Sequence, residues 1–243
     1  MNKKSAAITV IAVILSFVGG FLLANAVNRS ELTSLRTEND RLKSTDGDST
    51  NSELTVDEID QKVAEADSKP DDQNYQRTLG LALYRYGSMK QNTDILTRSA
   101  RLLERASTLK KDDRDAVVGL GNAYFDIGYF AKDNESLKKA RVAYERALAL
   151  KGDDASVISD LALTYFLEDP PDLSTAEELF HKALKIDPKH ERALQFLVQT
   201  LVKEGKKTDA ARYLSELKLV NSSNDAIPEL SSMVADSESP GNK

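Results

Sequence analysis

The chain has 243 residues, enough for one or two domains, and a formal net charge of −6. This acidic balance does not favour a protein that holds nucleic acid by its phosphates. The chain has no cysteine, which excludes disulfides and thiolate catalysis, and its two histidines, His181 and His190, do not have the spacing of two metal ligands on one helix face.

The first segment with a clear pattern predicts a membrane anchor. Residues 6–27 carry no charge, and as a helix they would be about 33 Å long, enough to cross a hydrocarbon core of about 30 Å. Lys3 and Lys4 precede this run, so the positive-inside rule keeps residues 1–5 in the cytoplasm. We therefore expect a single-pass protein of the inner or cytoplasmic membrane, with the rest of the chain on the periplasmic side.

A cleaved signal peptide is the alternative interpretation of the same run. Ala24 and Ala26 flank one residue in the small-x-small pattern that precedes a cleavage site. The apolar run is longer than the usual stretch of about 7–15 residues in a signal peptide, which favours retention as an anchor. Both interpretations export the remaining residues, and they differ only in whether the protein stays attached.

Residues 30–43 predict a short coiled coil or a helical stalk. Consecutive a and d positions of a heptad pattern are occupied by Leu32, Leu35, Asn39 and Leu42. An asparagine at an a position favours a two-stranded pair in register. Two heptads are too few to associate freely in water, but a membrane tether would raise their effective concentration. A homodimer through this segment and a solvated stalk both remain open.

Two segments lead from the stalk to the main body of the chain. Residues 44–53 contain no apolar side chain and predict a flexible linker. Residues 54–72 predict an amphipathic helix that ends at Pro70 and caps the first hairpin of the body. Its expected apolar side is formed by Leu54, Val56, Ile59, Val63 and Ala66.

The middle of the chain contains a repeated pattern. Residues 73–113 and 114–154 have equal lengths of 41 residues, and in each a Leu-Gly step opens the apolar pattern. Pairs of aspartates lie at 71–72, 112–113 and 153–154. Repetition with a period of about 20–50 residues predicts stacked helical hairpins, each of which buries its apolar face against its neighbours.

From residue 73 onward the sequence resembles the tetratricopeptide repeat family. The best match is 155–190, with Ala162 and Tyr165 in its first helix and Ala176 and Phe180 in its second. Residues 191–224 make a fourth repeat of 34 residues, the period of the family. The resemblance implies an all-α fold, a tetratricopeptide-repeat α-solenoid over residues 73–224.

Three details of these hairpins can be predicted. Small residues such as Gly80 and Gly121 are expected where two helices approach closely. Gly87, Gly128 and Gly205 are expected to end the first helices in the left-handed conformation. The seven extra residues of the first two repeats either lengthen both helices or lengthen the loop between them, and we expect a mixture of the two.

The chain beyond the repeats predicts a final short helix and a tail. Residues 225–236 form the expected helix, with Asp225 as its cap and Pro228 in its first turn. This helix would shield the last hairpin from solvent. Residues 237–243 predict a disordered tail.

The first helices of such arrays line the concave side, so the resemblance implies a binding groove there. One position of the repeat, directly after the motif's aromatic residue or leucine, is occupied by Tyr84, Phe125, Phe166 and Val202. Such a row suits the apolar anchors of a peptide or helix, and the same position is also used for packing in the family. The polar residues predicted beside it are Arg77, Arg85, Asn122, Asp126, Arg192, Gln195, Gln199 and Lys203.

The functional prediction is a membrane-tethered scaffold or adaptor that binds proteins or peptides in this groove. Its layout is similar to bacterial inner-membrane tetratricopeptide proteins, which implies a role in assembling or maintaining an envelope or secretion machine. The alternatives are a self-associating structural protein and a soluble exported protein. We predict no catalytic site, because the carboxylates recur at repeat boundaries and solvent faces, as helix caps do. We also predict no cofactor or metal site and no nucleic-acid partner.

Overall fold

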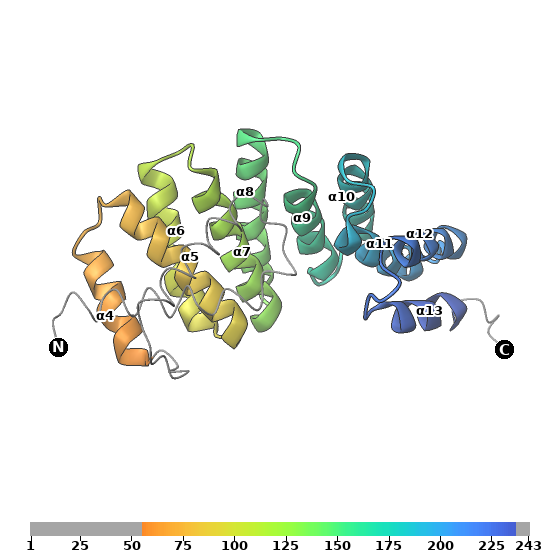
Figure 1. Cartoon of the computed structure of the whole chain (residues 1–243), viewed down its shortest axis with the longest axis horizontal. Coiled ribbons are helices and arrows are strands. Elements are labelled where there is room, and N and C mark those ends of the chain that lie inside the picture. Colours follow the sequence, from red (N-terminus) through yellow and green to blue (C-terminus); the bar gives the residue numbers. More distant parts are fainter. Residues whose placement is uncertain (1–54, 237–243) are drawn as a thin grey trace, which may run out of the picture. The chain divides into compact units, whose positions relative to one another are not determined.

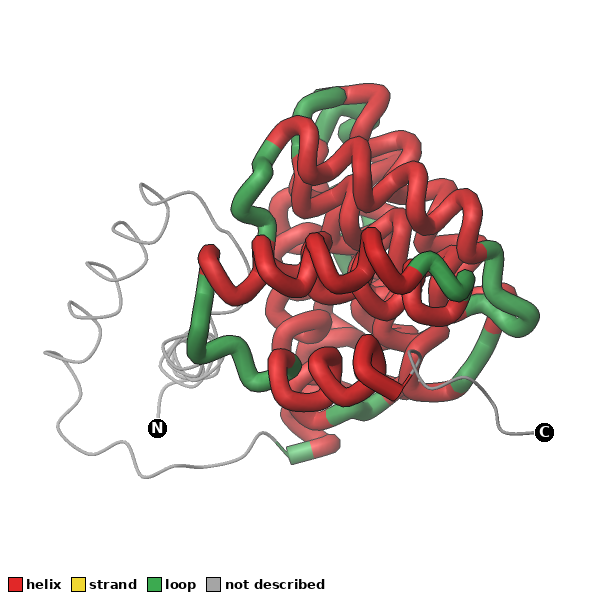
Figure 2. The backbone as a smooth tube through the Cα atoms, turned by 90° about the vertical axis from the view of Figure 1, so that its right-hand side faces the viewer, coloured by secondary structure: helices red, strands yellow, loops and turns green. Residues whose placement is uncertain are grey.

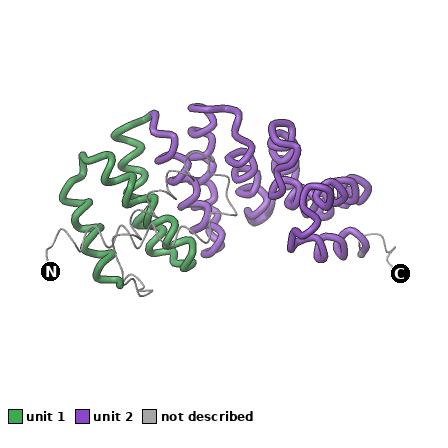
Figure 3. Tube along the Cα trace, viewed as in Figure 1, with its two compact units in different colours: residues 1–111 green, residues 112–243 purple. Residues whose placement is uncertain are grey.

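The computed structural model describes residues 55–236, which form ten α-helices joined by loops and contain no strand (Figures 1 and 2). The chain divides into two compact units, unit 1 at residues 1–111 and unit 2 at residues 112–243 (Figure 3). Each unit has its own apolar core. The described part is therefore all-α, with its helices paired into hairpins, which confirms the expected class of fold.

Five predicted segments lie outside the described residues: the N-terminus at 1–5, the span at 6–27, the stalk at 30–43, the linker at 44–53 and the tail at 237–243. Within residues 55–236, no helix combines the length and the apolar character needed to cross a bilayer. The membrane anchor and the stalk therefore stay predictions.

Unit 1 consists of the hairpin α5–α6 and the helix α4, which packs on α5. The bounds are α4 (Val56–Asp67), α5 (Gln73–Lys90) and α6 (Thr93–Leu109). At the start of α4, the Thr55 and Glu58 side chains each accept a hydrogen bond from the other residue's backbone N–H, which stabilises the first turn. The predicted apolar side is correct for Ile59, Val63 and Ala66 but wrong for Val56, which is 68% exposed.

Polar contacts complete the attachment of α4 to the hairpin. The buried amide of Gln76 on α5 donates to the carbonyl oxygens of Ala66 at 2.7 Å and Lys69 at 2.9 Å. Asp67 accepts from Arg101 at 2.6 Å and from Arg105 at 3.1 Å, both on α6. The end of α4 is thus bonded to both helices of the hairpin.

Unit 2 contains three hairpins and a final helix. Their bounds are α7 (Arg114–Ala131), α8 (Asn134–Leu150), α9 (Ala155–Leu167), α10 (Leu173–Ile186), α11 (Glu191–Lys203), α12 (Lys207–Val220) and α13 (Ile227–Asp236). Successive hairpins meet through α8 with α9 and α10 with α11, and α13 packs on α11 and α12. At the start of α13 the structure differs from the prediction, because the Asn224 side chain accepts the hydrogen bond from the backbone of Ala226.

The paired aspartates of the sequence are helix caps, as their positions indicate. The second member of each pair precedes a first helix and accepts a backbone N–H from its first turn, and these residues are Asp72, Asp113 and Asp154. Such a cap satisfies an N–H group that has no partner inside the helix and is worth about 1 kcal/mol. Asn92 and Asp133 cap the second helices α6 and α8 in the same way.

The extra residues of the first two hairpins lie in the helices. Helices α5 and α7 have 18 residues and α6 and α8 have 17, whereas α9 and α11 have 13 and α10 and α12 have 14. The loop between α5 and α6 consists of residues 91–92, and the loop between α7 and α8 consists of residues 132–133. The predicted mixture was therefore wrong, since each helix gains about one turn and neither loop is lengthened.

Contrary to the prediction, Gly87 and Gly128 do not end the first helices. Helices α5 and α7 continue past them, and the left-handed residues are Gln91 at φ 51° and Lys132 at φ 54°. Both glycines instead lie where the second helix of the same hairpin begins, and a Cβ on Gly128 would come within 2.7 Å of the Leu137 side chain. The same close approach explains Gly80 and Gly121, as predicted. Of the three glycines expected to be left-handed, only Gly205, at φ 76°, has that conformation.

Replacing Gly128 with alanine is expected to destabilise the α7–α8 hairpin by about 1–3 kcal/mol, because the added methyl group has no space. The Leu137 backbone nitrogen lies 3.0 Å from the new Cβ and cannot move aside cheaply. Amide hydrogen exchange of residues 114–150 would measure the loss. Gly152→Ala is the matched control, because its Cβ meets nothing closer than 3.8 Å. Equal protection in the two variants would contradict the packing role of Gly128.

Candidate protein-binding surface

The predicted groove residues all lie on the first helices of hairpins. In unit 1, Arg77, Tyr84 and Arg85 lie on α5 and are partly buried. In unit 2, the residues on α7 are Asn122, Phe125 and Asp126, the residue on α9 is Phe166, and those on α11 are Gln195, Gln199, Val202 and Lys203. The surface described next belongs to unit 2 alone.

Two observations indicate that the first helices line the inner side of unit 2. Helix α9 contacts both α7 and α11 directly, although each belongs to another hairpin. The Arg192 guanidinium on α11 lies 5.8 Å from the ring centre of Phe125 on α7, so side chains meet across α9. A meeting across an intervening helix requires the stack to curve toward that side. We call this side the inner surface and define it by Asn122, Asp126, Asp160, Arg192, Gln195, Gln199 and Lys203.

The two phenylalanines predicted for the groove, Phe125 and Phe166, are buried in unit 2. Phe125 and Phe166 are each 8% exposed. Phe166 meets the edge of the Phe196 ring at 5.6 Å between centroids, and the Lys203 ammonium lies 5.1 Å from the centre of the Phe166 ring. The two phenylalanines therefore form the buried floor of the inner surface, and a cation from α11 lies over each ring.

An ion pair between α9 and α11 fixes one end of the inner surface. The Arg192 guanidinium donates to Asp160 at 2.7 Å. Burial raises the pKa of the Asp160 carboxyl group, and the positive charge of Arg192 acts in the opposite direction. Because Arg192 also lies over the ring of Phe125, its guanidinium is held by two neighbours at once.

Polar groups on either side of this pair are presented to solvent. The Tyr144 hydroxyl donates to the Asn122 side-chain oxygen at 2.9 Å and so fixes the orientation of that amide on α7. Gln195 and Gln199 lie one turn apart on α11 and are partly exposed. Neither glutamine amide hydrogen-bonds to another residue of the described part, so both remain open to water or a ligand.

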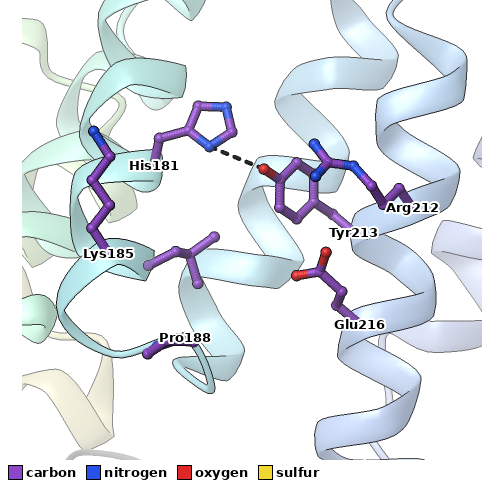
Figure 4. A pocket seen from close by; sticks show the side chains of 7 residues that line it. His181, Lys185, Pro188, Arg212, Tyr213 and Glu216 are labelled. Atoms are coloured by element: carbon purple, nitrogen blue, oxygen red, sulfur yellow. Dashed lines mark hydrogen bonds between the residues drawn. The ribbon is translucent and has the colours of Figure 1, made fainter.

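A second concavity, which the sequence did not indicate, lies on the second helices α10 and α12. It has a volume of about 490 Å³ and is lined by His181, Leu184, Lys185, Pro188, Arg212, Tyr213 and Glu216 (Figure 4). The Tyr213 hydroxyl and His181 Nδ1 are 3.3 Å apart across it. The sequence does contain a signal for this concavity, which was missed. His181 and Lys185 are one helical turn apart, as are Arg212 and Glu216, so each pair lies on one helix face.

The described residues offer no cluster suited to metal binding. Across residues 55–236, no three side chains of histidine, aspartate or glutamate lie together in a way that could hold a metal ion. The carboxylates whose pKa values are lowered include the helix caps Asp133 and Asp172, where hydrogen bonds from Ser136 and Thr175 respectively stabilise the charged form. These shifts follow from capping the helices.

The fold defines the class of this protein as an α-solenoid of helical hairpins. Residues 172–236 match the family profile described as tetratricopeptide repeat. The last hairpins of the chain thus carry the tetratricopeptide repeat signature in their sequence, and the remaining hairpins share the fold. A comparison with curated proteins gave no match.

Solved structures with a similar fold include several of MamA. MamA from residue 41 to its end, from Desulfovibrio magneticus RS-1, is 20% identical, with a TM-score of 0.56 over 70% of this chain and 86% of that chain. Another MamA crystal structure is 20% identical, with a TM-score of 0.55 over 88% and 100%. A thermophilic tetratricopeptide repeat protein from Thermus thermophilus is 14% identical, with a TM-score of 0.52 over 74% and 88%. At such identities the similarity shows the fold alone.

Proposed function

We propose that this chain is a membrane-tethered adaptor that binds a protein or peptide ligand on the inner surface of unit 2. The main support is the arrangement of α11, where Gln195 and Gln199 present free amide groups between the cations of Arg192 and Lys203. A floor of buried phenylalanines and a rim of polar side chains is the usual composition of a protein-binding site. The class of fold is also one whose members act by holding other proteins.

The tether and the location belong to the same proposal. They rest on the uncharged run at residues 6–27 and on the two lysines before it. In this proposal the hairpins lie on the periplasmic side of the inner membrane, and the bound protein belongs to an envelope or secretion machine. The stalk at 30–43 would pair two copies through Leu32, Leu35, Asn39 and Leu42.

Photo-crosslinking in intact membranes tests the ligand surface directly. A photoreactive amino acid at position 199 should capture a discrete partner, because this residue faces the inner surface. The same group at position 178, an exposed residue of the second helix α10, is the matched control and should capture none. Equal capture at both positions would contradict the assignment of the surface.

The double variant Gln195→Ala and Gln199→Ala is expected to weaken binding of the captured partner about tenfold, since each lost polar contact removes roughly 0.5–1 kcal/mol. Binding by the purified full-length protein in detergent would be measured by titration. The double variant Glu178→Ala and Lys182→Ala changes exposed residues of α10 and should bind as the wild type does. An unchanged affinity in the glutamine variant would overturn the proposal.

Two measurements separate the alternatives for the N-terminal half. The mass of the mature protein shows whether the apolar run is retained, because cleavage after Ala26 would remove residues 1–26. The mass of the detergent-solubilised particle, compared with a chain that starts at residue 54, shows whether self-association depends on residues 6–43. A chain that self-associates equally without these residues would favour the structural alternative.

A further inference from the structure

The cap of α11 differs from the caps of the other first helices. Helices α5, α7 and α9 each begin after an aspartate whose side chain accepts a backbone N–H, and these aspartates are Asp72, Asp113 and Asp154. Helix α11 begins after His190, and here the imidazole takes the place of the carboxylate. Carboxylate caps stay charged well below neutral pH, whereas an imidazole changes its charge near pH 6.5.

The hydrogen bonds of His190 define its protonation state. The backbone N–H of Ala193 donates to His190 Nδ1 at 3.1 Å, so Nδ1 carries a lone pair and no proton. The proton of the neutral ring therefore lies on Nε2, which is 3.2 Å from the Ser156 hydroxyl oxygen on α9 and donates to it. One neutral imidazole thus caps α11 and bonds it to the preceding first helix.

The charged groups around the ring come from three elements. Asp154 caps α9 and Asp160 lies within it, Asp187 lies in the loop before α11, and Arg192 lies in the first turn of α11. Burial lowers the pKa of His190, Arg192 acts in the same direction, and the three aspartates oppose them, leaving the pKa below its ordinary value. The partial positive charge at the helix start also disfavours an imidazolium ion.

We infer that His190 is a pH-sensitive fastener, through which mild acid weakens the attachment of the last hairpin, α11–α12, to the hairpin α9–α10. A proton on Nδ1 replaces the lone pair that accepts from Ala193, so the protonated ring cannot cap the helix. Unfolded or opened forms take up this proton at higher pH than the closed form. The stabilisation by the neutral cap is therefore complete above about pH 6.5 and is lost as pH falls toward the lower pKa of the closed form.

The fastener affects the inner surface because most residues of that surface lie on α11. Opening of α11 would separate Arg192 from Asp160 and move both glutamines away from Asn122. A ligand that needs both sides of the surface would then bind less tightly at mildly acid pH. This consequence, unlike the fastener, rests on the proposed function.

Hydrogen exchange of the full-length protein in detergent, corrected for the intrinsic pH dependence of amide exchange, tests the fastener. Between about pH 7.5 and about pH 5.5, the amides of α11 and α12 should lose about fivefold more protection than those of α7, the loss expected for one helix cap. His190→Asn supplies an acceptor that does not titrate in this range and should remove the difference. His190→Asp, with the residue used at the other first helices, is the second variant and should do the same.

The second histidine provides the control, since the chain has only two. His181→Gln should retain the pH-dependent loss of protection in α11 and α12. The inference is overturned if wild type shows no selective loss, if both His190 variants keep it, or if His181→Gln abolishes it. Nitrogen NMR gives an independent readout: the neutral ring of His190 should carry its proton on Nε2, and a proton on Nδ1 would contradict the proposed cap.

Discussion

Replacing Tyr144 with alanine is expected to lower the free energy of unfolding of unit 2 by about 3–5 kcal/mol, the range for removing a large buried aromatic side chain. Tyr144 is 1% exposed and fills the space against Gly121, where a Cβ would lie 2.6 Å from its ring. Gly121 has no side chain with which to fill the resulting cavity. Hydrogen exchange of residues 114–150 and denaturant unfolding of the full-length protein in detergent would measure the loss.

The variant Tyr144→Phe separates the contribution of the ring to stability from that of the hydroxyl group. It keeps the ring and removes the 2.9 Å hydrogen bond to Asn122, so the expected loss is about 1 kcal/mol. The same variant leaves the Asn122 amide without its fixed partner on the inner surface. If the phenylalanine variant were destabilised as much as the alanine variant, the ring would not be the main source of stability.

The second large effect is expected at Gln76 in unit 1. Gln76→Glu replaces a donor by a carboxylate that faces the carbonyl oxygens of Ala66 and Lys69, inside a site with no exposed surface. We expect a loss of about 3 kcal/mol in the stability of the α4 attachment, because like partial charges meet away from water. Arg105, which donates to the Gln76 side-chain oxygen at 3.3 Å, offsets only part of this cost, since it also pairs with Asp67. Gln76→Leu removes the same bonds without adding a charge and should cost about 2 kcal/mol.

Hydrogen exchange of α4 is the measurement, since α4 depends on these bonds more than the α5–α6 hairpin does. Lowering the pH should partly restore Gln76→Glu, because a protonated carboxyl group can again donate to a carbonyl oxygen. Asn74→Ala, an exposed change on the same helix, should be neutral within about 0.5 kcal/mol. Unchanged protection of α4 in Gln76→Glu would show that the hydrogen bonds of Gln76 do not hold this helix.

Much of the fold was predictable because its signals are local and repeated. The period of the Leu-Gly steps predicted helical hairpins, since a small residue at the close approach recurs as Gly80, Gly121 and Ala162 in the first three repeats. The aspartate pairs predicted the starts of the first helices, because a cap needs only its own first turn. Gly87 and Gly128 were misinterpreted for the complementary reason: a glycine at a helix end and a glycine under a neighbouring helix look the same in the sequence alone.

The candidate surface was predictable in its helices but not in its details. Its residues, apart from Asp160, were expected on first helices, and they lie there, whereas Asp160 was missed because only its ion pair with Arg192 marks it. The burial of Phe125 depends on Arg192, which comes from a helix two hairpins later, so no local pattern reveals it. The cap at His190 had a signal that was missed, since the residue before the other first helices is an aspartate.

The sequence by itself determined an all-helical array of hairpins, the caps that start its first helices and an uncharged N-terminal run long enough for a membrane. These follow from composition and spacing within a few turns of chain. Only the tertiary structure decided which small residues mark contacts, which aromatic rings are covered and which groups contact the ring of His190. Those properties arise where side chains distant in sequence pack together, and the free energy of that packing is shared between both partners.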